Sequence, residues 1–507
     1  MEDIQREAHV KRSRLGSIFV PPLVSLVCVA GAASAEATAS TGAPSPVTAP
    51  NRGVANATDS PLNADGDSAL RLTTAKEVEA YFEGKKAGFD PMFRVVADGA
   101  SFEIRSKRSG YGKPLVTTVR HGDQEVTLPA GSIEKFGALP RFIRLDYSKR
   151  GEKVATTYQA ACLNGWTTER IRPDAPLRSP YPQDCTASRI TLGTVMGVQE
   201  GYATQLESWS TAKLKPGRYQ VTAQIRGKYR SLFGITDDAG SSTFKLRVVN
   251  GDPETGEDVE HHSRTATPSL RAAAREPSRR AAGEPAGPMP DLRSIPAFGL
   301  RLNASTKFLQ FSGTVWNAGN SPLVVDGFRR PKEDVMDAYQ YFLDADGNQV
   351  GYQQVGTMEW DNKDTHQHWH FRDFARYRLL DADKKAIVRS RKEAFCLANT
   401  DAIDYTVDGA DWQPEATDLH TACGDKDSLS IREVLASGSG DTYAQFRAGQ
   451  SFKISDLPNG IYYISVEANP VNRLVESDTS NNIAYRKIKI SGKPTARTVK
   501  AYPFTAK

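Results

Sequence analysis

The chain has few histidines, few cysteines and little that could cross a membrane. Its 507 residues include eight histidines and five cysteines, and 39% are hydrophobic. One apolar run, residues 15–32, approaches the length of a membrane helix, but Pro21 and Pro22 interrupt it. No glycine-rich strand-to-helix motif is present, and the arginine-rich residues 254–290 contain no aromatic residues that could stack on bases. We therefore expect neither a phosphate-loop nucleotide site nor nucleic-acid binding.

The first residues are typical of an export signal. The basic "KRSR" of residues 11–14 precedes the apolar run, and the small-residue sequence "ASA" ends at Ala35. We predict a signal peptide at residues 1–35 and a secreted, extracellular protein with no membrane association once the signal is removed. The alternatives are a membrane anchor, which the two prolines oppose, and lipidation of Cys28, which no small residue precedes.

Removal of this signal leaves four cysteines, which are expected to form disulfides in an oxidising compartment. Three pairings are possible. We favour Cys162 with Cys185 and Cys396 with Cys423, because each pair lies within one expected domain. Each bond would close a loop of about 25 residues and contribute ~3 kcal/mol in the loop-entropy estimate.

Two segments of small, polar and proline-rich residues divide the chain, because they cannot bury enough apolar area to fold. We predict a disordered tether at residues 36–70 and a flexible linker at residues 253–290. The remaining parts are an N-terminal β-rich domain at residues 71–252, a second domain at residues 291–492 and a C-terminal tail at residues 493–507.

Short runs of alternating polar and apolar residues occur in both halves. "RYQVTAQI" and "IYYISVEA" each follow turn-forming residues, and proline plus glycine total 69 in the chain. This pattern predicts a mainly β fold built of antiparallel β-sandwich domains.

The two halves also resemble each other. Residues 201–225 resemble residues 441–468, "AACLNG" resembles "AFCLAN", and "GKPLV" resembles "NSPLV". We interpret these matches as a diverged internal duplication. The first copy lacks a histidine cluster and has Tyr158 where the second has Lys392, so we expect it to be non-catalytic.

The sequence "DTHQHWHF" places His366, His368 and His370 on alternating positions. On a strand, alternating side chains point to one face. The outer two Cα atoms would lie roughly 13 Å apart, so the rings must lean together, or the strand must bend, to reach one ion. Imidazole suits Cu(II) and Zn(II) better than Mg or Ca. The alternative is an exposed polar strand without a metal.

Three further motifs follow the histidines: "RKEAFCLANT", "SGDTYAQF" and "NPVNRLVESDTSNN". Together with "MEWDNKDTHQHWHF", they resemble the catalytic domain of the lysyl oxidase family in order and spacing. The resemblance extends from about Pro290 to Gly492. It implies a C-terminal lysyl oxidase-like domain preceded by a diverged sandwich domain.

The resemblance implies copper at His366, His368 and His370, and a lysine tyrosylquinone formed from Lys392 and Tyr443. The chemistry of these residue types agrees, because neither a lysine nor a tyrosine alone accepts two electrons, whereas a quinone does. The implied activity is that of a copper-dependent protein-lysine 6-oxidase, which converts a peptidyl lysine amine to an aldehyde with release of hydrogen peroxide and ammonia. Lysine-containing peptides or proteins and dioxygen are the implied partners, and a small amine substrate stays open.

The "ESDTSNN" segment supplies hard oxygen ligands from Glu476, Asp478, Asn481 and Asn482. The resemblance implies a calcium site that Asp291 and the backbone carbonyl of Leu292 complete. The alternative is a turn of the kind found before the last strand of extracellular β-sandwich modules.

The chain departs from the animal members of the family near the implied quinone. Arg391 replaces the histidine before the lysine, and no acid follows Tyr443 closely, so the general base is unassigned; Asp373 and Asp441 are the nearest candidates. Two non-enzymatic alternatives stay open: a pair of extracellular β-sandwich binding modules with a metal site, and a copper storage or delivery protein.

Overall fold

The computed structural model is mainly β, as the sequence predicts. It describes residues 62, 68–83, 85–165, 167–185, 187–206, 209–250, 287–362, 367–390, 394–417, 419–447 and 449–504. Within these residues the helices are short, namely α1 (Gly227–Phe233) and the 3-10 turn η3 (Pro414–Ala416). No helix in the described ranges is long and apolar enough to cross a membrane.

The N-terminal half, residues 68–250, forms three sheets. The largest has the order β13 (Ser210–Ala212), β3 (Lys86–Phe89), β2 (Glu77–Glu83), β15 (Ser241–Asn250), β14 (Gly217–Ile225), β8 (Leu139–Lys149) and β9 (Glu152–Ala161). The second has the order β1 (Arg71–Thr73), β4 (Arg94–Ala97), β12 (Tyr202–Gln205) and β10 (Thr168–Arg170). The third has the order β11 (Gly193–Val198), β5 (Phe102–Lys107), β6 (Val116–His121) and β7 (Gln124–Thr127). The pairing of β2 with β15 is parallel, and the other strand pairings in the described residues of this half are antiparallel.

The C-terminal half, residues 287–504, also forms three sheets. One has the order β16 (Leu292–Leu302), β17 (Phe308–Asn317), β27 (Ser439–Tyr443) and β25 (Asp401–Ala402), with β28 (Ser451–Lys453) also pairing with β17. The next has the order β24 (Ala394–Phe395), β21 (His368–Arg372), β20 (Gln349–Asp361), β19 (Val335–Leu343), β18 (Leu323–Arg329) and β26 (Ser430–Leu435). The last has the order β23 (Ala386–Arg389), β22 (Ala375–Leu380), β29 (Gly460–Ala468), β30 (Ile483–Lys493) and β31 (Ala496–Ala501).

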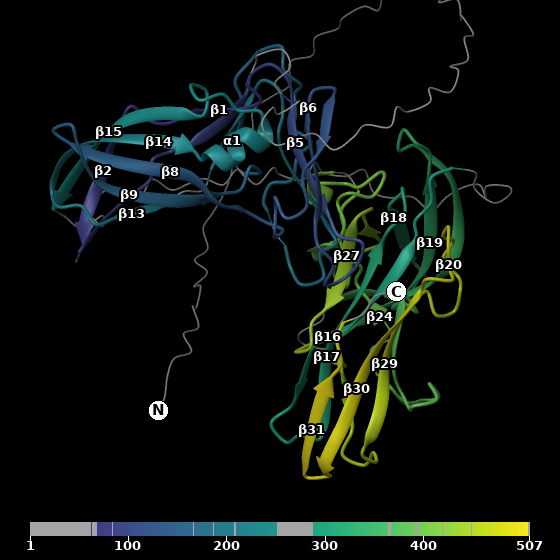
Figure 1. The fold of residues 1–507 in the computed structure, drawn as a ribbon. Helices are drawn as coiled ribbons and strands as arrows, with labels where there is room; N and C mark the ends of the chain where they lie inside the picture. Colours follow the sequence, from purple (N-terminus) through teal and green to yellow (C-terminus); the bar gives the residue numbers. More distant parts are fainter. Residues whose placement is uncertain are drawn as a thin grey trace, which may run out of the picture. The chain divides into compact units, whose positions relative to one another are not determined.

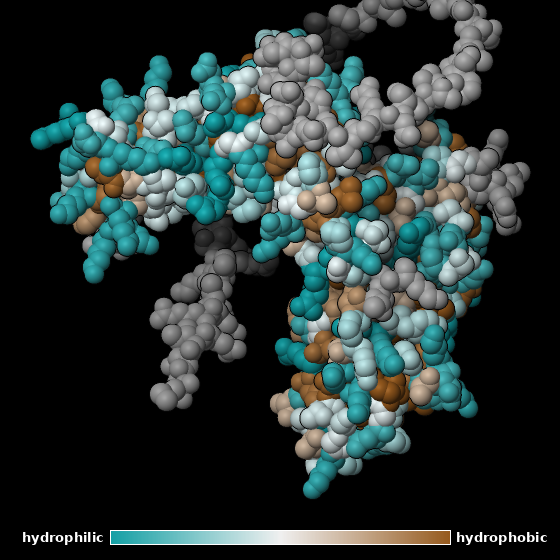
Figure 2. Space-filling model, in the orientation of Figure 1, coloured by the Kyte–Doolittle hydropathy of each residue, from teal (hydrophilic) through white to brown (hydrophobic). Residues whose placement is uncertain are grey.

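Alternation of side chains explains the strands and the core. In β14, Tyr219, Val221 and Ala223 are buried, whereas Gln220 between the first two is exposed and Thr222 between the last two is half-buried. Each half buries its inward-facing residues in a core of its own. Many outward-facing residues are polar or charged, and hydrophilic side chains are frequent over the β2, β8, β9 and β15 region in the view of Figure 2.

The two halves share strand orders, as an internal duplication predicts. In the first pair of sheets, the order β9, β8, β14, β15 corresponds to β23, β22, β29, β30. In the second, the order β1, β4, β12, β10 corresponds to β16, β17, β27, β25. In the third, the order β11, β5, β6, β7 corresponds to β26, β18, β19, β20. One predicted match is wrong: "NSPLV" leads into β18, whose counterpart is β5, but "GKPLV" leads into β6.

The last sheet extends beyond the predicted domain end at Gly492. Strand β31 pairs with β30 along its whole length, and the three strands β29, β30 and β31 lie side by side in Figure 1. The expected C-terminal tail is therefore a paired strand as far as Ala501, and residues 494–495 form the turn that returns the chain onto β30. The predicted signal peptide lies outside the described residues, as do the predicted tether and linker except for residues 62, 68–70 and 287–290. The tether prediction is wrong at its described residues, because Leu62, Ala69 and Leu70 are buried in the N-terminal core.

Candidate active site

Strand β21 presents two of the three predicted histidines on one face. His368 and His370 alternate with Trp369, whose side chain is fully buried in the C-terminal core. The two imidazoles face each other, with His368 Nε2 and His370 Nε2 2.9 Å apart. His366 lies outside the described residues, so the structure brings together two imidazoles of the predicted set.

The spacing of these nitrogens fits two ligands of one metal ion. Two nitrogens, each about 2.0 Å from a shared ion, would lie roughly 2.8–3.3 Å apart at the usual ligand angles. Asp361 Oδ2 lies 3.6 Å from His370 Nδ1, on the other side of that ring, where a carboxylate favours the tautomer with the proton on Nδ1 and the lone pair on Nε2. An imidazole donor set suits copper or zinc.

Tyr443 is held by its hydroxyl group at the end of β27. The Cys396 N–H donates to Tyr443 Oη at 3.0 Å, and Oη donates to the Cys396 carbonyl at 3.1 Å. The Phe395 ring packs edge-on against the tyrosine ring, with centroids 4.9 Å apart. Burial, and then the negative charges of Asp441 and Glu433, raise the pKa of Tyr443 well above its usual value, so the phenol is protonated at neutral pH.

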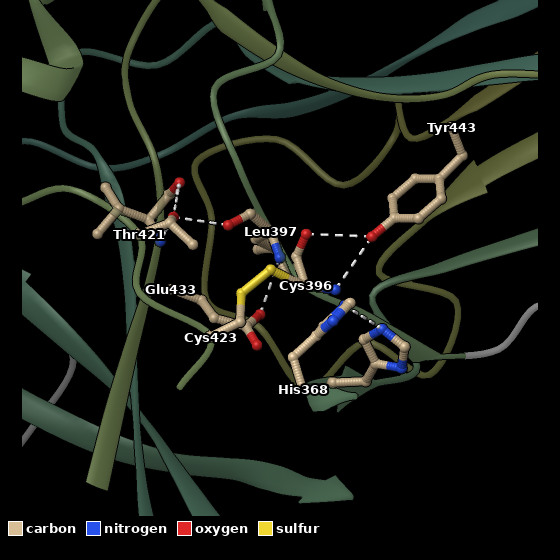
Figure 3. The surroundings of a disulfide bond; sticks show 9 residues. His368, Cys396, Leu397, Thr421, Cys423, Glu433 and Tyr443 are labelled. Atoms are coloured by element: carbon tan, nitrogen blue, oxygen red, sulfur yellow. Dashed lines mark hydrogen bonds between the residues drawn. A yellow bond between two sulfur atoms is a disulfide. The ribbon is translucent and has the colours of Figure 1, made fainter. Parts of the chain in front are cut away.

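A disulfide connects the histidine strand to this tyrosine. Cys396 is bonded to Cys423, and Cys162 is bonded to Cys185, which are the two pairings we favoured. The Trp369 N–H, between the two histidines, donates to the Cys423 carbonyl at 3.0 Å. Cys423 thus contacts β21, while its disulfide partner Cys396 holds the Tyr443 hydroxyl. Figure 3 shows the Tyr443 hydroxyl directed at Cys396, with His368 close to the bond.

Two buried carboxylates accompany the tyrosine. Glu433 accepts a hydrogen bond from the Leu397 N–H at 3.0 Å, and its side chain is fully buried. Asp441 lies two residues before Tyr443 on the same face of β27 and is also buried. The other base candidate, Asp373, lies in the turn between β21 and β22 with φ +59. Our sequence interpretation missed Asp361 and Glu433, since nothing in their local pattern distinguishes them.

The predicted calcium ligands lie together where β16 begins. Asn481 Nδ2 donates to Asp291 Oδ1 at 2.9 Å and to Asp478 Oδ2 at 3.0 Å. Glu476 accepts hydrogen bonds from Asn482 Nδ2 and from the Leu292 N–H, both at 2.8 Å. Asp291, Asp478 and Asn481 therefore form one hydrogen-bonded group, and Glu476, Asn482 and Leu292 form a second one next to it in the chain. Leu292 contributes its N–H, and not its carbonyl, to the contact with Glu476.

Two observations bear on whether a cation fits this network. Asn481 Oδ1 and Asn482 Oδ1 are buried and accept no hydrogen bond from any described residue, so each is a free oxygen donor of the kind that calcium takes. Arg293 already pairs with Asp291 at 2.6 Å. No group of three or more His, Cys, Asp or Glu side chains in the described part of the chain is arranged to hold one ion, so amide oxygens would have to complete the ligand set.

Two predicted site residues, His366 and Lys392, lie outside the described residues, as does Arg391. Residues 363–366 precede β21 in the chain and residues 391–393 precede β24, and these two strands pair with each other. Whether Lys392 meets Tyr443 therefore stays a prediction.

The fold and the site define a class: a mainly β protein whose C-terminal sandwich holds an imidazole pair, suited to a metal, beside an anchored tyrosine. The lysyl oxidase family model matches residues 346–500. Protein-lysine 6-oxidase of Rattus norvegicus is 33% identical over 135 residues, which are 26% of this chain and 29% of the rat protein. Lysyl oxidase homolog 1 of Homo sapiens is 32% identical over 144 residues, 28% of this chain and 22% of the human protein.

The chain thus spans under a third of the length of these two relatives. Its C-terminal region carries a lysyl oxidase family domain, and β-rich sheets precede that domain.

Proposed function

We propose that this chain is a secreted copper amine oxidase that acts on the ε-amine of peptidyl lysine. One observation carries the proposal: the Cys396–Cys423 disulfide connects the strand of His368 and His370 to the backbone that holds the Tyr443 hydroxyl. The family domain supports the activity, and the two disulfides are typical of proteins from oxidising compartments.

In this proposal His368 and His370, with His366, hold copper. Bound copper would supply, with dioxygen, the oxidising power that converts Tyr443 and Lys392 to a lysine tyrosylquinone, the group that accepts the substrate's electrons. Asp361 orients His370 toward the metal. The backbone of Cys396 orients the phenol before it is modified, since one carbonyl and one N–H bind the same oxygen.

The proposal assigns Asp441 as the base that takes the substrate's α-proton. It lies on the Tyr443 face of β27, and burial away from water favours proton transfer to a carboxylate. Asp373 is less suited, because it lies in a turn and makes no described contact with Tyr443. The Asn481 and Asn482 oxygens support a calcium ion that would join the start of β16 to the segment before β30.

Peroxide release from lysine-rich peptides tests the proposal. Copper-loaded protein should release peroxide, and phenylhydrazine should give a coloured adduct. Both should disappear in His370→Ala and Tyr443→Phe. The matched controls are His420→Ala and Tyr463→Phe in the same domain, which should keep both signals. A copper-loaded parent protein that gives no adduct and no peroxide would favour a non-catalytic binding module.

A further inference from the structure

The N-terminal half contacts the loop that the Cys396–Cys423 disulfide closes. The Leu192 N–H donates to the Ile403 carbonyl at 2.6 Å, and the Tyr405 N–H donates to the Gly193 carbonyl at 3.1 Å. Gly193 and Asp404 form a parallel β-bridge. The start of β11 therefore continues the backbone pairing of the catalytic half.

Side chains of the two disulfide loops also pack together. Tyr181, inside the loop closed by Cys162 and Cys185, stacks on Trp412, with ring centroids 5.8 Å apart and planes 10° apart. Gln413 Nε2 donates to the carbonyl of Tyr181. This contact fixes the far side of the catalytic disulfide loop.

An apolar cluster, separate from the two main cores, lies under the backbone pairing. Ile190 of the N-terminal half packs with Ile295, Trp316 and Ile403 of the catalytic half, and all four are buried. Full burial of a large apolar side chain contributes about 1.5–3 kcal/mol. The contact therefore stabilises the packing of the N-terminal half on the C-terminal half.

The contacted loop is continuous with the strand that carries Tyr443. Residue 403 follows β25, and β25 pairs with Ser439 and Gly440 of β27. Thr400 Oγ1 accepts a hydrogen bond from the Thr442 N–H at 2.7 Å. A strand of two residues at a sheet edge has little stability of its own, so β25 depends on what holds its ends.

The geometry points to a role for the N-terminal domain: it is a positioning module that holds β25 against β27 and so fixes the Tyr443 phenol at the Cys396 backbone for conversion to the quinone. This inference rests on the proposed function for its consequence, but the positioning itself can be measured without any activity. Gly193 is the central residue, because a Cβ atom there would collide with Asp404 Oδ1.

The test compares Gly193→Ala with Gly99→Ala in the full chain, because a Cβ atom at Gly99 would meet nothing within 4 Å. Hydrogen exchange of peptides that contain Thr400 and Thr442, measured on copper-free protein, should be at least about tenfold faster in Gly193→Ala and unchanged in Gly99→Ala. Gly193→Ala with Asp404→Ala removes the closest of the two collisions, leaving Thr406 Oγ1 at 2.8 Å from the added Cβ atom, and should restore part of the protection.

A second readout separates positioning from general damage. In Gly193→Ala and in Trp412→Ala, bound copper per chain should stay at the parent level while the phenylhydrazine-reactive fraction falls several-fold. Unchanged exchange in β25 and β27 of Gly193→Ala, or parallel loss of copper and quinone, would overturn the inference. If exchange responds as expected but the parent protein never forms a quinone, the proposed function fails and the positioning role stands.

Discussion

Removal of each disulfide in turn separates stability from positioning. The Cys162–Cys185 and Cys396–Cys423 bonds span 23 and 27 residues of sequence. In the loop-entropy estimate both contribute about 3.5 kcal/mol to the free energy of unfolding. Replacement of either pair by serine should therefore destabilise the domain that holds it by a similar amount, which makes the N-terminal pair a matched control.

The functional outcomes should differ. Cys396 holds the Tyr443 hydroxyl, and Cys423 accepts the Trp369 N–H between the histidines. Loss of their bond should lower the phenylhydrazine-reactive fraction per folded chain at least about tenfold. Loss of the Cys162–Cys185 bond should change that fraction far less. Denaturant unfolding gives the stability, and carbonyl titration at a temperature where both variants stay folded gives the site. Equal losses in the two variants would refute the reasoning.

Three further predictions concern stability and pH. Asp326→Ala should cost about 3–5 kcal/mol in denaturant unfolding, since it leaves Arg432 without its buried partner, whereas loss of the exposed ion pair through Glu77→Ala should cost under about 1 kcal/mol. The pKa of Tyr443 is raised in the folded protein, so as pH rises the phenol loses its proton in the unfolded chain before it does so in the folded one. The free energy of unfolding of copper-free protein should therefore fall as pH rises above about 10. Tyr443→Phe should reduce this fall by up to about 1.4 kcal/mol per pH unit. Calcium at about 100 times its dissociation constant should raise the free energy of unfolding by about 2.7 kcal/mol in the parent and not in Asn482→Ala, and no rise in the parent would remove the calcium proposal.

The strands and the fold class could be predicted from the sequence because their signal is local. Alternation in "RYQVTAQI" requires only that every second residue be apolar, and β14 follows it residue by residue. The histidine pair is equally local, since positions 368 and 370 share a face on any strand. The predicted end of the domain at Gly492 was wrong because the local signal is weaker there. Polar and apolar residues alternate less clearly in β31, which is a strand because it pairs with β30.

The surroundings of the candidate site could not be predicted in this way. Glu433 acts through a contact with Leu397, 36 residues away, and no motif marks it. Asp361 stands in the histidine motif, but its contact with His370 is visible only once β20 and β21 are paired. The link from Cys423 to Trp369 is a backbone hydrogen bond, which leaves no trace in the side-chain pattern. The contact between Leu192 and Ile403 is likewise a backbone hydrogen bond between residues far apart in the sequence.

Mass spectrometry of peptides from copper-loaded, oxygen-exposed protein tests the central claim most directly. The account predicts one cross-linked species that joins the peptide containing Lys392 to the peptide containing Tyr443, with the mass of a quinone, and its absence from His370→Ala. Copper-saturated parent protein in which the two peptides remain separate and unmodified would contradict it.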